Sequence, residues 1–138
     1  EEGSTLLLTI FYAALSLALI LIVVATTSLY LERKRLFTLA DGAALVGAEA
    51  FDLGSVVPSA QGYRPTLKSG DVASAVADYI ADNPVDGVRQ LRVDRAITAD
   101  GRSATVELSA YWSPPVASLL LPKGFRITVT SVARSVFS

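Results

Sequence analysis

Residues 28–50 have the sequence SLYLERKRLFTLADGAALVGAEA, and this stretch decides how the chain folds. It begins at the end of an uncharged apolar run, crosses the charged segment ERKR at 32–35, and continues in helix-forming residues without a proline. A membrane anchor usually ends at such a charged segment, but residues 28–50 contain no proline that would break the helix. We therefore predict that one helix continues from the apolar run into the domain that follows.

The apolar run before this segment is long enough to cross a membrane, because residues 5–31 contain no charged side chain. As a helix, about 27 residues extend roughly 40 Å, whereas a hydrocarbon core is about 30 Å thick. A signal peptide is the alternative, but its apolar region spans only about 7–15 residues before a small-residue cleavage site. We predict a transmembrane helix. Since the sequence contains no methionine, we also expect processing or truncation upstream of Glu1.

Apolar residues beyond residue 31 form a stripe with the spacing of one helix face. The stripe comprises Leu36, Leu39, Ala43, Val46, Ala50 and Leu53. Small residues gather on or beside it, at Ala40, Gly42, Ala43, Ala44, Gly47 and Ala48. Small side chains let another backbone approach closely, so we expect this face to be packed. With no proline before Pro58, the simplest interpretation is one rod of roughly 48 residues and about 70 Å.

The remaining residues predict a small head. Residues 52–70 are rich in Gly, Ser and Pro and predict a loop. An amphipathic helix should follow at 71–84, with Ser69 or Asp71 as its cap and a stop at Asn83 and Pro84. Its apolar face comprises Val72, Ala75, Val76, Tyr79 and Ile80.

Alternating residues predict three strands, at 88–98, 102–112 and 125–137. The expected inward residues are Leu91, Val93 and Ile97 in the first strand, Ala104, Val106, Leu108, Ala110 and Trp112 in the second, and Phe125, Ile127, Val129 and Ala133 in the third. In the second strand, Thr105, Glu107 and Ser109 should point outward. The Asp-Gly pair at 100–101 predicts a hairpin between the first two strands, and the proline-rich residues 113–124 predict a longer connection.

These elements predict an α+β fold, with a long N-terminal apolar helix and a small head of one short helix and a three-stranded antiparallel sheet. Residues 1–53 would form the helix and residues 54–138 the head. The sheet should cover the small-residue face of the long helix.

The composition offers little for catalysis or metal binding. The sequence contains no histidine and no cysteine, which removes the commonest general base and the thiolate metal ligands. Carboxylates remain, but they are spaced like the solvated face of a helix, at Asp71, Asp78, Asp82 and Asp86. We therefore expect no enzymatic activity, no catalytic residue, no cofactor and no metal ion.

Binding to nucleic acid is not expected either, because the net charge is −1 and the isoelectric point is near 5.3. Four arginines do cluster around the predicted hairpin, at Arg89, Arg92, Arg95 and Arg102. They could form a local basic patch, but the alternating pattern favours the solvated face of the sheet.

The segment SLYLERKRLFTLADGAALVGAEAF at 28–51 resembles the tight-adherence (Tad) pilus proteins of the TadE/TadG type. Their signature is an apolar N-terminal helix, a Leu-Tyr-plus-basic segment, and an Ala-Asp-Ala-Ala-Leu-Ala-Gly-Ala run. The segment ITVTSVARSVF at 127–137, with its preceding proline-rich loop, is similar to the closing segment of that group. Residues 52–98 add little to the resemblance.

This resemblance implies a pilin or pseudopilin of the type IV pilin-like superfamily. Such a chain is inserted in the inner or cytoplasmic membrane, clipped by a prepilin peptidase, and drawn by the pilus assembly machinery into a helical homo-oligomeric filament. Residues 1–53 would be transmembrane before assembly and the filament core afterwards. The implied function is that of a structural subunit of an extracellular Tad/Flp-type surface filament, with adhesion or surface attachment as its role.

Type IV pilins carry a glutamate at the fifth mature position, where it pairs with a neighbouring N-terminal amine, and Thr5 cannot do so. Glu1 and Glu2 are the substitutes. We hypothesise that one of them pairs with a cation of the ERKR segment in a subunit staggered along the filament, since acids and bases lie about 45 to 50 Å apart on a continuous helix. The candidate assembly residues are therefore Glu1, Glu2, Arg33, Lys34 and Arg35.

Two alternatives remain. The ERKR segment can act as a topogenic stop, which would place the head in the cytoplasm, whereas the family resemblance favours the outside. The chain can also be a single-pass membrane-anchored accessory pseudopilin or scaffold of the assembly machinery that does not form the bulk filament. The two functions differ in whether the apolar helix remains in lipid.

Overall fold

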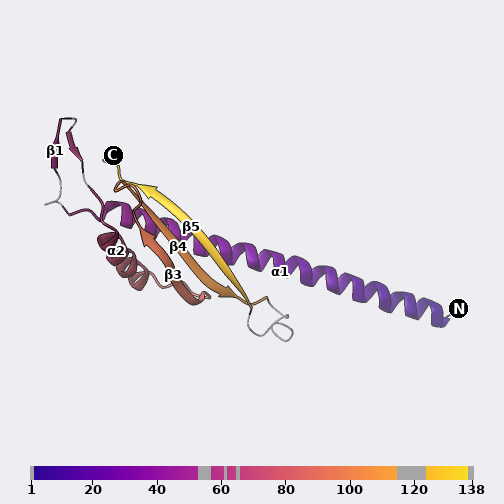
Figure 1. The fold of residues 1–138 in the computed structure, drawn as a ribbon. Coiled ribbons are helices and arrows are strands. Elements are labelled where there is room, and N and C mark those ends of the chain that lie inside the picture. The colour runs from indigo at the N-terminus through magenta and orange to yellow at the C-terminus, as the bar shows by residue number, and fades with distance from the viewer. Residues whose placement is uncertain (1, 53–56, 61, 65, 115–123, 137–138) are drawn as a thin grey trace.

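A computed structural model describes residues 2–52, 57–60, 62–64, 66–114 and 124–136. The elements in chain order are α1 (Glu2–Glu49), β1 (Val57–Ser59), β2 (Gly62–Arg64), α2 (Ser69–Asp82), β3 (Arg89–Ile97), β4 (Ser103–Trp112) and β5 (Phe125–Arg134). The last three form an antiparallel sheet in the order β3-β4-β5. The predicted α+β fold is confirmed, and Figure 1 shows α1 extending far beyond the head.

Helix α1 is continuous over 48 residues, as the absence of a breaker predicted. Two hydroxyl groups of its apolar half have partners within the helix, since Thr9 Oγ1 donates to the Thr5 carbonyl at 2.9 Å and Thr26 Oγ1 to the Ile22 carbonyl at 2.8 Å. A backbone carbonyl one turn earlier is the partner that remains in a medium without water. The hydroxyl groups of Thr9 and Thr26 are therefore compatible with lipid.

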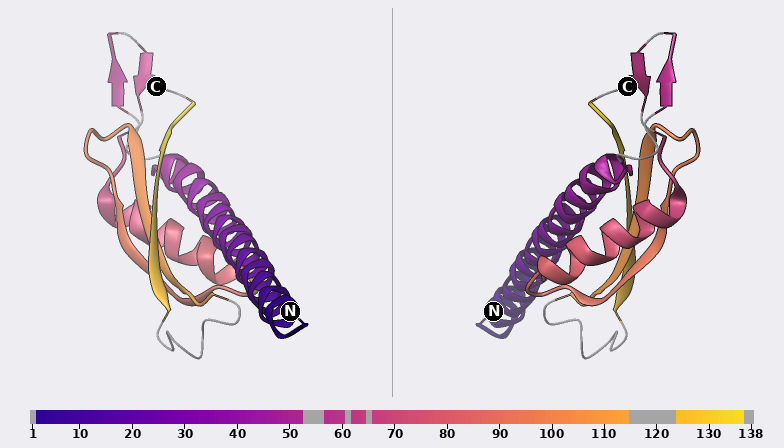
Figure 2. Two further views of the ribbon diagram at one scale, coloured as in Figure 1. Left: turned by 90° about the vertical axis from the view of Figure 1, so that its right-hand side faces the viewer. Right: turned by 90° about the vertical axis from the view of Figure 1, so that its left-hand side faces the viewer.

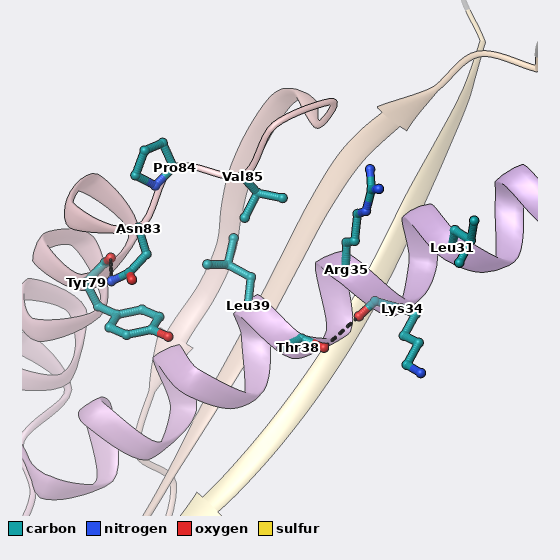
Figure 3. Close-up of a pocket in the computed structure, with 9 residues that line it drawn as sticks. All are labelled: Leu31, Lys34, Arg35, Thr38, Leu39, Tyr79, Asn83, Pro84 and Val85. Carbon is teal, nitrogen blue, oxygen red and sulfur yellow. Dashed lines mark hydrogen bonds between the residues drawn. The ribbon is translucent and has the colours of Figure 1, made fainter.

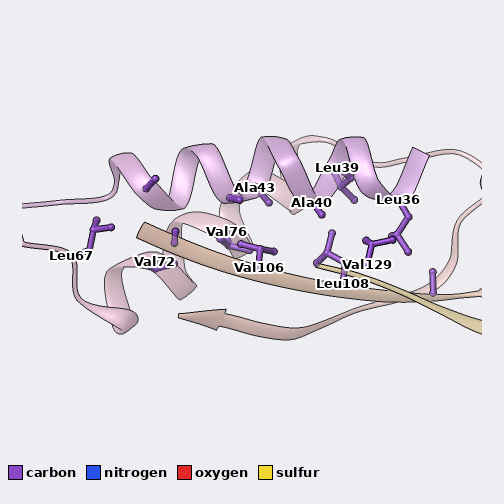
Figure 4. Close-up of a cluster of buried hydrophobic side chains, with 14 residues drawn as sticks. Leu36, Leu39, Ala40, Ala43, Leu67, Val72, Val76, Val106, Leu108 and Val129 are labelled. Carbon is purple, nitrogen blue, oxygen red and sulfur yellow. The ribbon is translucent and has the colours of Figure 1, made fainter. Parts of the chain in front are cut away.

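The small-residue face of α1 is the centre of the core, as predicted. Four alanines are completely buried, namely Ala40, Ala43, Ala44 and Ala48, and Leu36 and Leu39 extend the same face. Figure 4 shows this face lying over side chains of β4, β5 and α2. Val46 and Ala50, which the stripe also included, are half-buried, and Leu53 lies outside the described residues.

Two glycines of α1 allow the other elements to approach closely. A Cβ at Gly42 would lie 2.7 Å from Tyr79 Cζ. A Cβ at Gly47 would lie 3.1 Å from Val72 Cγ1 on α2 and 3.2 Å from Ala104 Cβ on β4. Gly47 therefore touches both α2 and the sheet, so both helices lie on the same face of the sheet. Figure 2 shows α1 and the sheet as neighbouring layers.

Substituting Gly47→Val should destabilise the head by about 1–3 kcal/mol, because the added side chain would push α2 and β4 away from α1. The free energy of unfolding can be measured in detergent by urea titration, with the chain's one tryptophan, Trp112, as the fluorescent reporter. The matched control is Gly3→Val, where a Cβ meets nothing within 4 Å. Equal stability of the two variants would contradict the close packing at residue 47.

Strand β4 alternates as predicted. Its inward residues, Ala104, Val106, Leu108, Ala110 and Trp112, are all buried. Ser109 points to the outer face as expected, but it is also buried, because the Arg126 guanidinium lies against it and donates to its Oγ at 2.6 Å. Burial on the outer face therefore comes from a neighbouring strand and not from the core.

Strand β3 departs from the predicted alternation. Leu91 packs against the core as expected. The register shifts beyond Val93, which places Ala96 opposite the buried Val106 and turns Ile97, 37% exposed, toward the outer face. The inward assignment of Ile97 was therefore wrong, because a β-bulge adds one residue and inverts the alternation that follows it. Val93 also remains 43% exposed.

The predicted inward residues of β5 are only partly confirmed. Of its predicted inward residues, Val129 is buried, Ile127 and Ala133 pack against the core, and Phe125 does not. Phe125 is 53% exposed and stacks on Trp112 with a ring-centroid distance of 6.3 Å. The inner face of β5 also carries Ser131, which donates a hydrogen bond to the Asp41 carboxylate of α1. Residue 137 and most of the 113–124 connection lie outside the described residues.

Two local predictions in the head require correction. The predicted loop at 52–70 contains the hairpin β1–β2, in which Val57 pairs with Arg64. Helix α2 begins at Ser69, and its N-cap is Lys68 without a side-chain hydrogen bond, so neither Ser69 nor Asp71 is the cap. Ser69 Oγ instead bonds the backbone of Thr98, which gives it a tertiary partner. The predicted stop is confirmed, with Asn83 as the C-cap.

The Asp-Gly pair does form the turn between β3 and β4. Asp100 Oδ1 accepts hydrogen bonds from the backbone N–H of Ser103 at 2.7 Å and of Arg102 at 2.9 Å, and from Ser103 Oγ at 2.8 Å. These bonds, the Ser103 backbone bond foremost, lower the pKa of Asp100 from 3.8 to about 2. Gly101 accommodates the positive φ of 70° that the turn requires.

This turn should make stability depend on pH in the acid range. Because the folded-state pKa is depressed, the Asp100 carboxylate stabilises the fold above pH 3.8, and that contribution is lost as pH falls toward about 2. The melting temperature of the wild type should therefore fall more steeply over this window than that of Asp100→Asn. Parallel curves for the two proteins would show that the turn does not hold the carboxylate in its charged form.

Candidate assembly surface

The head leaves the N-terminal half of α1 uncovered. Trp112 at the end of β4 donates its indole N–H to Ser28 Oγ at 3.2 Å, which marks where the head meets α1. The residues before it project into free space (Figure 1). Their large apolar side chains are exposed, for example Leu7 at 71%, Phe11 at 61% and Leu19 at 63%.

This projecting half has the dimensions of a membrane span. From Glu2 to the contact with Ser28 the helix rises about 39 Å, more than the roughly 30 Å of a hydrocarbon core. Among the described residues, α1 is the one helix long and apolar enough to cross a membrane. None of its most apolar stretch of 18 residues is buried. The chain can therefore keep this half out of water only with lipid or with another protein.

The ERKR segment lies at the base of the head, just beyond that contact. Arg35 Nη1 lies 3.4 Å from Glu32 Oε1, and both atoms approach Gly87 in the turn before β3. Arg33 and Lys34 are exposed, and neither forms an ion pair within the part of the chain that the structure describes. Of the three predicted assembly cations, Arg35 therefore already has an acidic neighbour, while the other two face solvent.

The two acidic assembly candidates are not brought to these cations within one chain. Glu2 is exposed at the far end of α1, about 46 Å along the helix from Arg33, and Glu1 lies outside the described residues. Any pairing between Glu2 and the ERKR cations must therefore join two chains, and it remains a prediction.

A groove adjoins the cations of the ERKR segment. It has a volume of about 480 Å³ and lies between α1 and the C-terminal end of α2 with the turn that follows. Its lining, shown in Figure 3, comprises Leu31, Lys34, Arg35, Thr38, Leu39, Tyr79, Asn83, Pro84 and Val85. The walls are mainly apolar, and the cations come from α1. A chain that approached Lys34 would therefore also meet an apolar surface.

The sequence did not predict the two contacts that fix the head on α1, those of Tyr79 with Gly42 and of Trp112 with Ser28. Small residues around Gly42 predicted close packing, but not that Tyr79 would fill the space. Trp112 was predicted to be buried, but its hydrogen bond to Ser28 joins residues 84 positions apart. An indole N–H at a buried strand end needs an acceptor, and this requirement is the signal that could have prompted a search for one.

Comparison with known proteins gives a family match for α1. Searches of curated proteins and of solved structures found no significant similarity. Residues 3–50, nearly the whole of α1, match the family model described as "Tad: Putative Flp pilus-assembly TadE/G-like". This match covers both halves of α1 and ends where the helix ends. The resemblance to TadE/TadG-like proteins is thereby confirmed over residues 3–50.

Proposed function

We propose that the chain is a structural subunit of a Tad/Flp-type surface filament, polymerising through α1. The observation that carries this proposal is the continuity of α1, whose C-terminal half is the core of the head and whose N-terminal half is apolar and uncovered. Such a helix rigidly connects a head to whatever surrounds its apolar half. The family match over the same residues supports a connection with the pilus.

The hydrophobic effect favours burial of the projecting half of α1 against lipid or another protein at all times. Burying one Leu, Ile, Val or Phe side chain contributes about 1.5–3 kcal/mol, so the exposed apolar residues between Leu6 and Leu31 together represent on the order of tens of kcal/mol. Lipid provides that cover before assembly. Equivalent helices of other subunits would provide it in a filament, so leaving the membrane and polymerising would occur together.

The proposed role is structural and not catalytic, with adhesion or surface attachment as the task of the filament. The apolar helix and the family match together indicate association with a membrane or a pilus. In our proposal the chain resides in the inner or cytoplasmic membrane, is processed by a prepilin peptidase, and is delivered by the assembly machinery to an extracellular homo-oligomeric filament.

The test is to shear cells that produce the chain, sediment the released material, and examine it by electron microscopy and mass spectrometry. Thin filaments composed mainly of this chain would support the proposal. A chain that remains with membranes and is extracted only by detergent would refute it. That outcome would favour a membrane-anchored accessory protein, a function that the family description, which names pilus assembly, also accommodates.

A further inference from the structure

Groups of charged side chains with opposite sign lie on the two layers of the head, arginines on the sheet and aspartates on α2. Helices α1 and α2 cover one face of the sheet, where Ala104, Val106 and Leu108 are buried. Residues of a strand alternate between faces, and paired residues of neighbouring strands share a face. Arg92 pairs with Ser109, directly before Leu108, so the arginines of β3 lie on the side of the sheet away from the helices.

Three arginines form a row along this outer face. Arg89 pairs with Tyr111, Arg92 with Ser109 and Arg95 with Glu107, and all three partners belong to the outward set of β4. The arginines are exposed. We call Arg89, Arg92 and Arg95 the arginine row. The bulges of β3 keep them on one face although their sequence spacing is three residues.

Three aspartates form a matching stripe on α2. Asp71, Asp78 and Asp82 are spaced by seven and four residues, so their side chains fall on one line along the helix. All three are exposed, whereas Val72 and Val76 of the same helix are buried. We call Asp71, Asp78 and Asp82 the aspartate stripe.

The head itself does not explain this stripe. Carboxylates near a helix C-terminus and like charges four residues apart are both unfavourable for the helix, and both apply to Asp78 and Asp82. Helix α2 contains no basic residue. Ion pairs among the described residues join Glu32 to Arg35, Asp94 to Arg126, and Asp100 to Arg134, so they include no member of the row or the stripe.

The row and the stripe also agree in length. Asp71 to Asp82 extends about 16 Å along a helix, and Arg89 to Arg95 at most about 20 Å along a strand. They lie on opposite layers of the head, so one chain cannot bring them together. Two copies can, and because the contact joins different surfaces of each copy it can repeat without closing. An open repeat is the arrangement that a filament requires.

We propose that the arginine row of one head contacts the aspartate stripe of the next head along the filament. The inference rests on the proposed function and adds to it the contact by which the heads associate. The partner is a second copy of this chain, because the same molecule carries both complementary surfaces.

The test uses two charge-reversal variants of the full chain. Arg92→Glu/Arg95→Glu places acids in the arginine row, and Asp78→Lys/Asp82→Lys places bases in the aspartate stripe. Each variant alone should give about tenfold fewer sheared filaments than the wild type, because like charges would meet at every contact. Co-expression of the two should restore the yield, since acidic and basic heads can then alternate. The control, Lys68→Glu/Arg102→Glu, reverses two exposed charges that belong to neither surface and should not lower the yield.

A second measurement detects the contact directly. In filaments of the Arg95→Lys variant, a carbodiimide should join the introduced amine to Asp78 or Asp82 of a neighbouring chain, and mass spectrometry should identify the linked peptides. Loss of filaments in both variants without restoration on co-expression would overturn the inference, because opposite charges on neighbouring heads would then not restore assembly. Filaments of normal yield from every variant would overturn it while leaving the proposed function intact. If the wild type forms no filaments, the proposed function fails and the inference fails with it.

Discussion

The double substitution Arg33→Glu/Lys34→Glu is expected to lower the yield of sheared filaments by about tenfold or more. These two cations are exposed and have no ion-pair partner within the described chain, whereas Arg35 lies beside Glu32. On a continuous helix they lie about 46 Å from Glu2, which is the axial stagger that would bring Glu2 of another subunit to them. A change of about 1.4 kcal/mol at each contact already shifts an association constant tenfold.

The measurement needs a control for membrane insertion, because basic residues beside a span influence its orientation. Protease accessibility of the head in intact cells distinguishes a chain inserted the wrong way from one that cannot assemble. Glu2→Lys introduced into the double variant restores opposite charges and should recover part of the yield. Normal filament yield from the double variant would refute the pairing.

Replacing Leu36 by Ala is expected to lower the free energy of unfolding of the head by about 2–5 kcal/mol, the range for large core residues. Leu36 is 1% exposed, is the first buried residue of α1, and lies close to Leu108 and Val129 (Figure 4). The substitution removes three carbons and leaves a cavity between α1 and the sheet. A loss of this size is a large fraction of the 5–15 kcal/mol that stabilises a typical domain.

The adjacent residue supplies the control for this prediction. Phe37 is 46% exposed on the same helix, so Phe37→Ala should change the free energy of unfolding much less than Leu36→Ala. Urea titration in detergent, followed by Trp112 fluorescence, measures both variants. Equal losses at the two positions would show that α1 does not present one fixed face to the sheet.

The parts of the fold that could be predicted are those set by local pattern. The course of α1 follows from a long sequence without breakers, and its packed face follows from small residues at helical spacing. Strand β4 was predicted because it is buried between neighbours and its alternation is uninterrupted. In each case a local feature of the sequence, such as the absence of helix breakers or the alternation of apolar residues, directly determines the structure that forms.

Two of the errors originate in tertiary contacts, and the third in the shortness of the strands. The bulge of β3 depends on pairing with β4, so Ile97 could not be placed correctly from β3 alone. Ser69 does not cap α2 because its hydroxyl is bonded to Thr98, 29 residues away. The hairpin β1–β2 has strands of three residues each, which are too short to show an alternation.

The candidate assembly residues were predictable only as charges on a helix. In the structure Arg33, Lys34 and Arg35 lie just beyond the Trp112–Ser28 contact, and their role in assembly stays a prediction. The sequence could not show that Arg35 lies beside Glu32, nor that the groove at Lys34 is completed by residues of α2 and the following turn. Those features depend on how the head packs against α1.

The central claim, that the apolar half of α1 exchanges lipid for other copies of itself, is tested most directly by crosslinking inside the filament. The sequence contains no cysteine, so a residue such as Leu19, 63% exposed, can be replaced by the only thiol in the chain. Sheared filaments of Leu19→Cys treated with a short apolar bis-maleimide should yield covalent dimers, because neighbouring helices bring two such thiols together. If the chain in sheared filaments stays monomeric while the same reagent reaches the thiol, the apolar halves are not packed against one another and the account is contradicted.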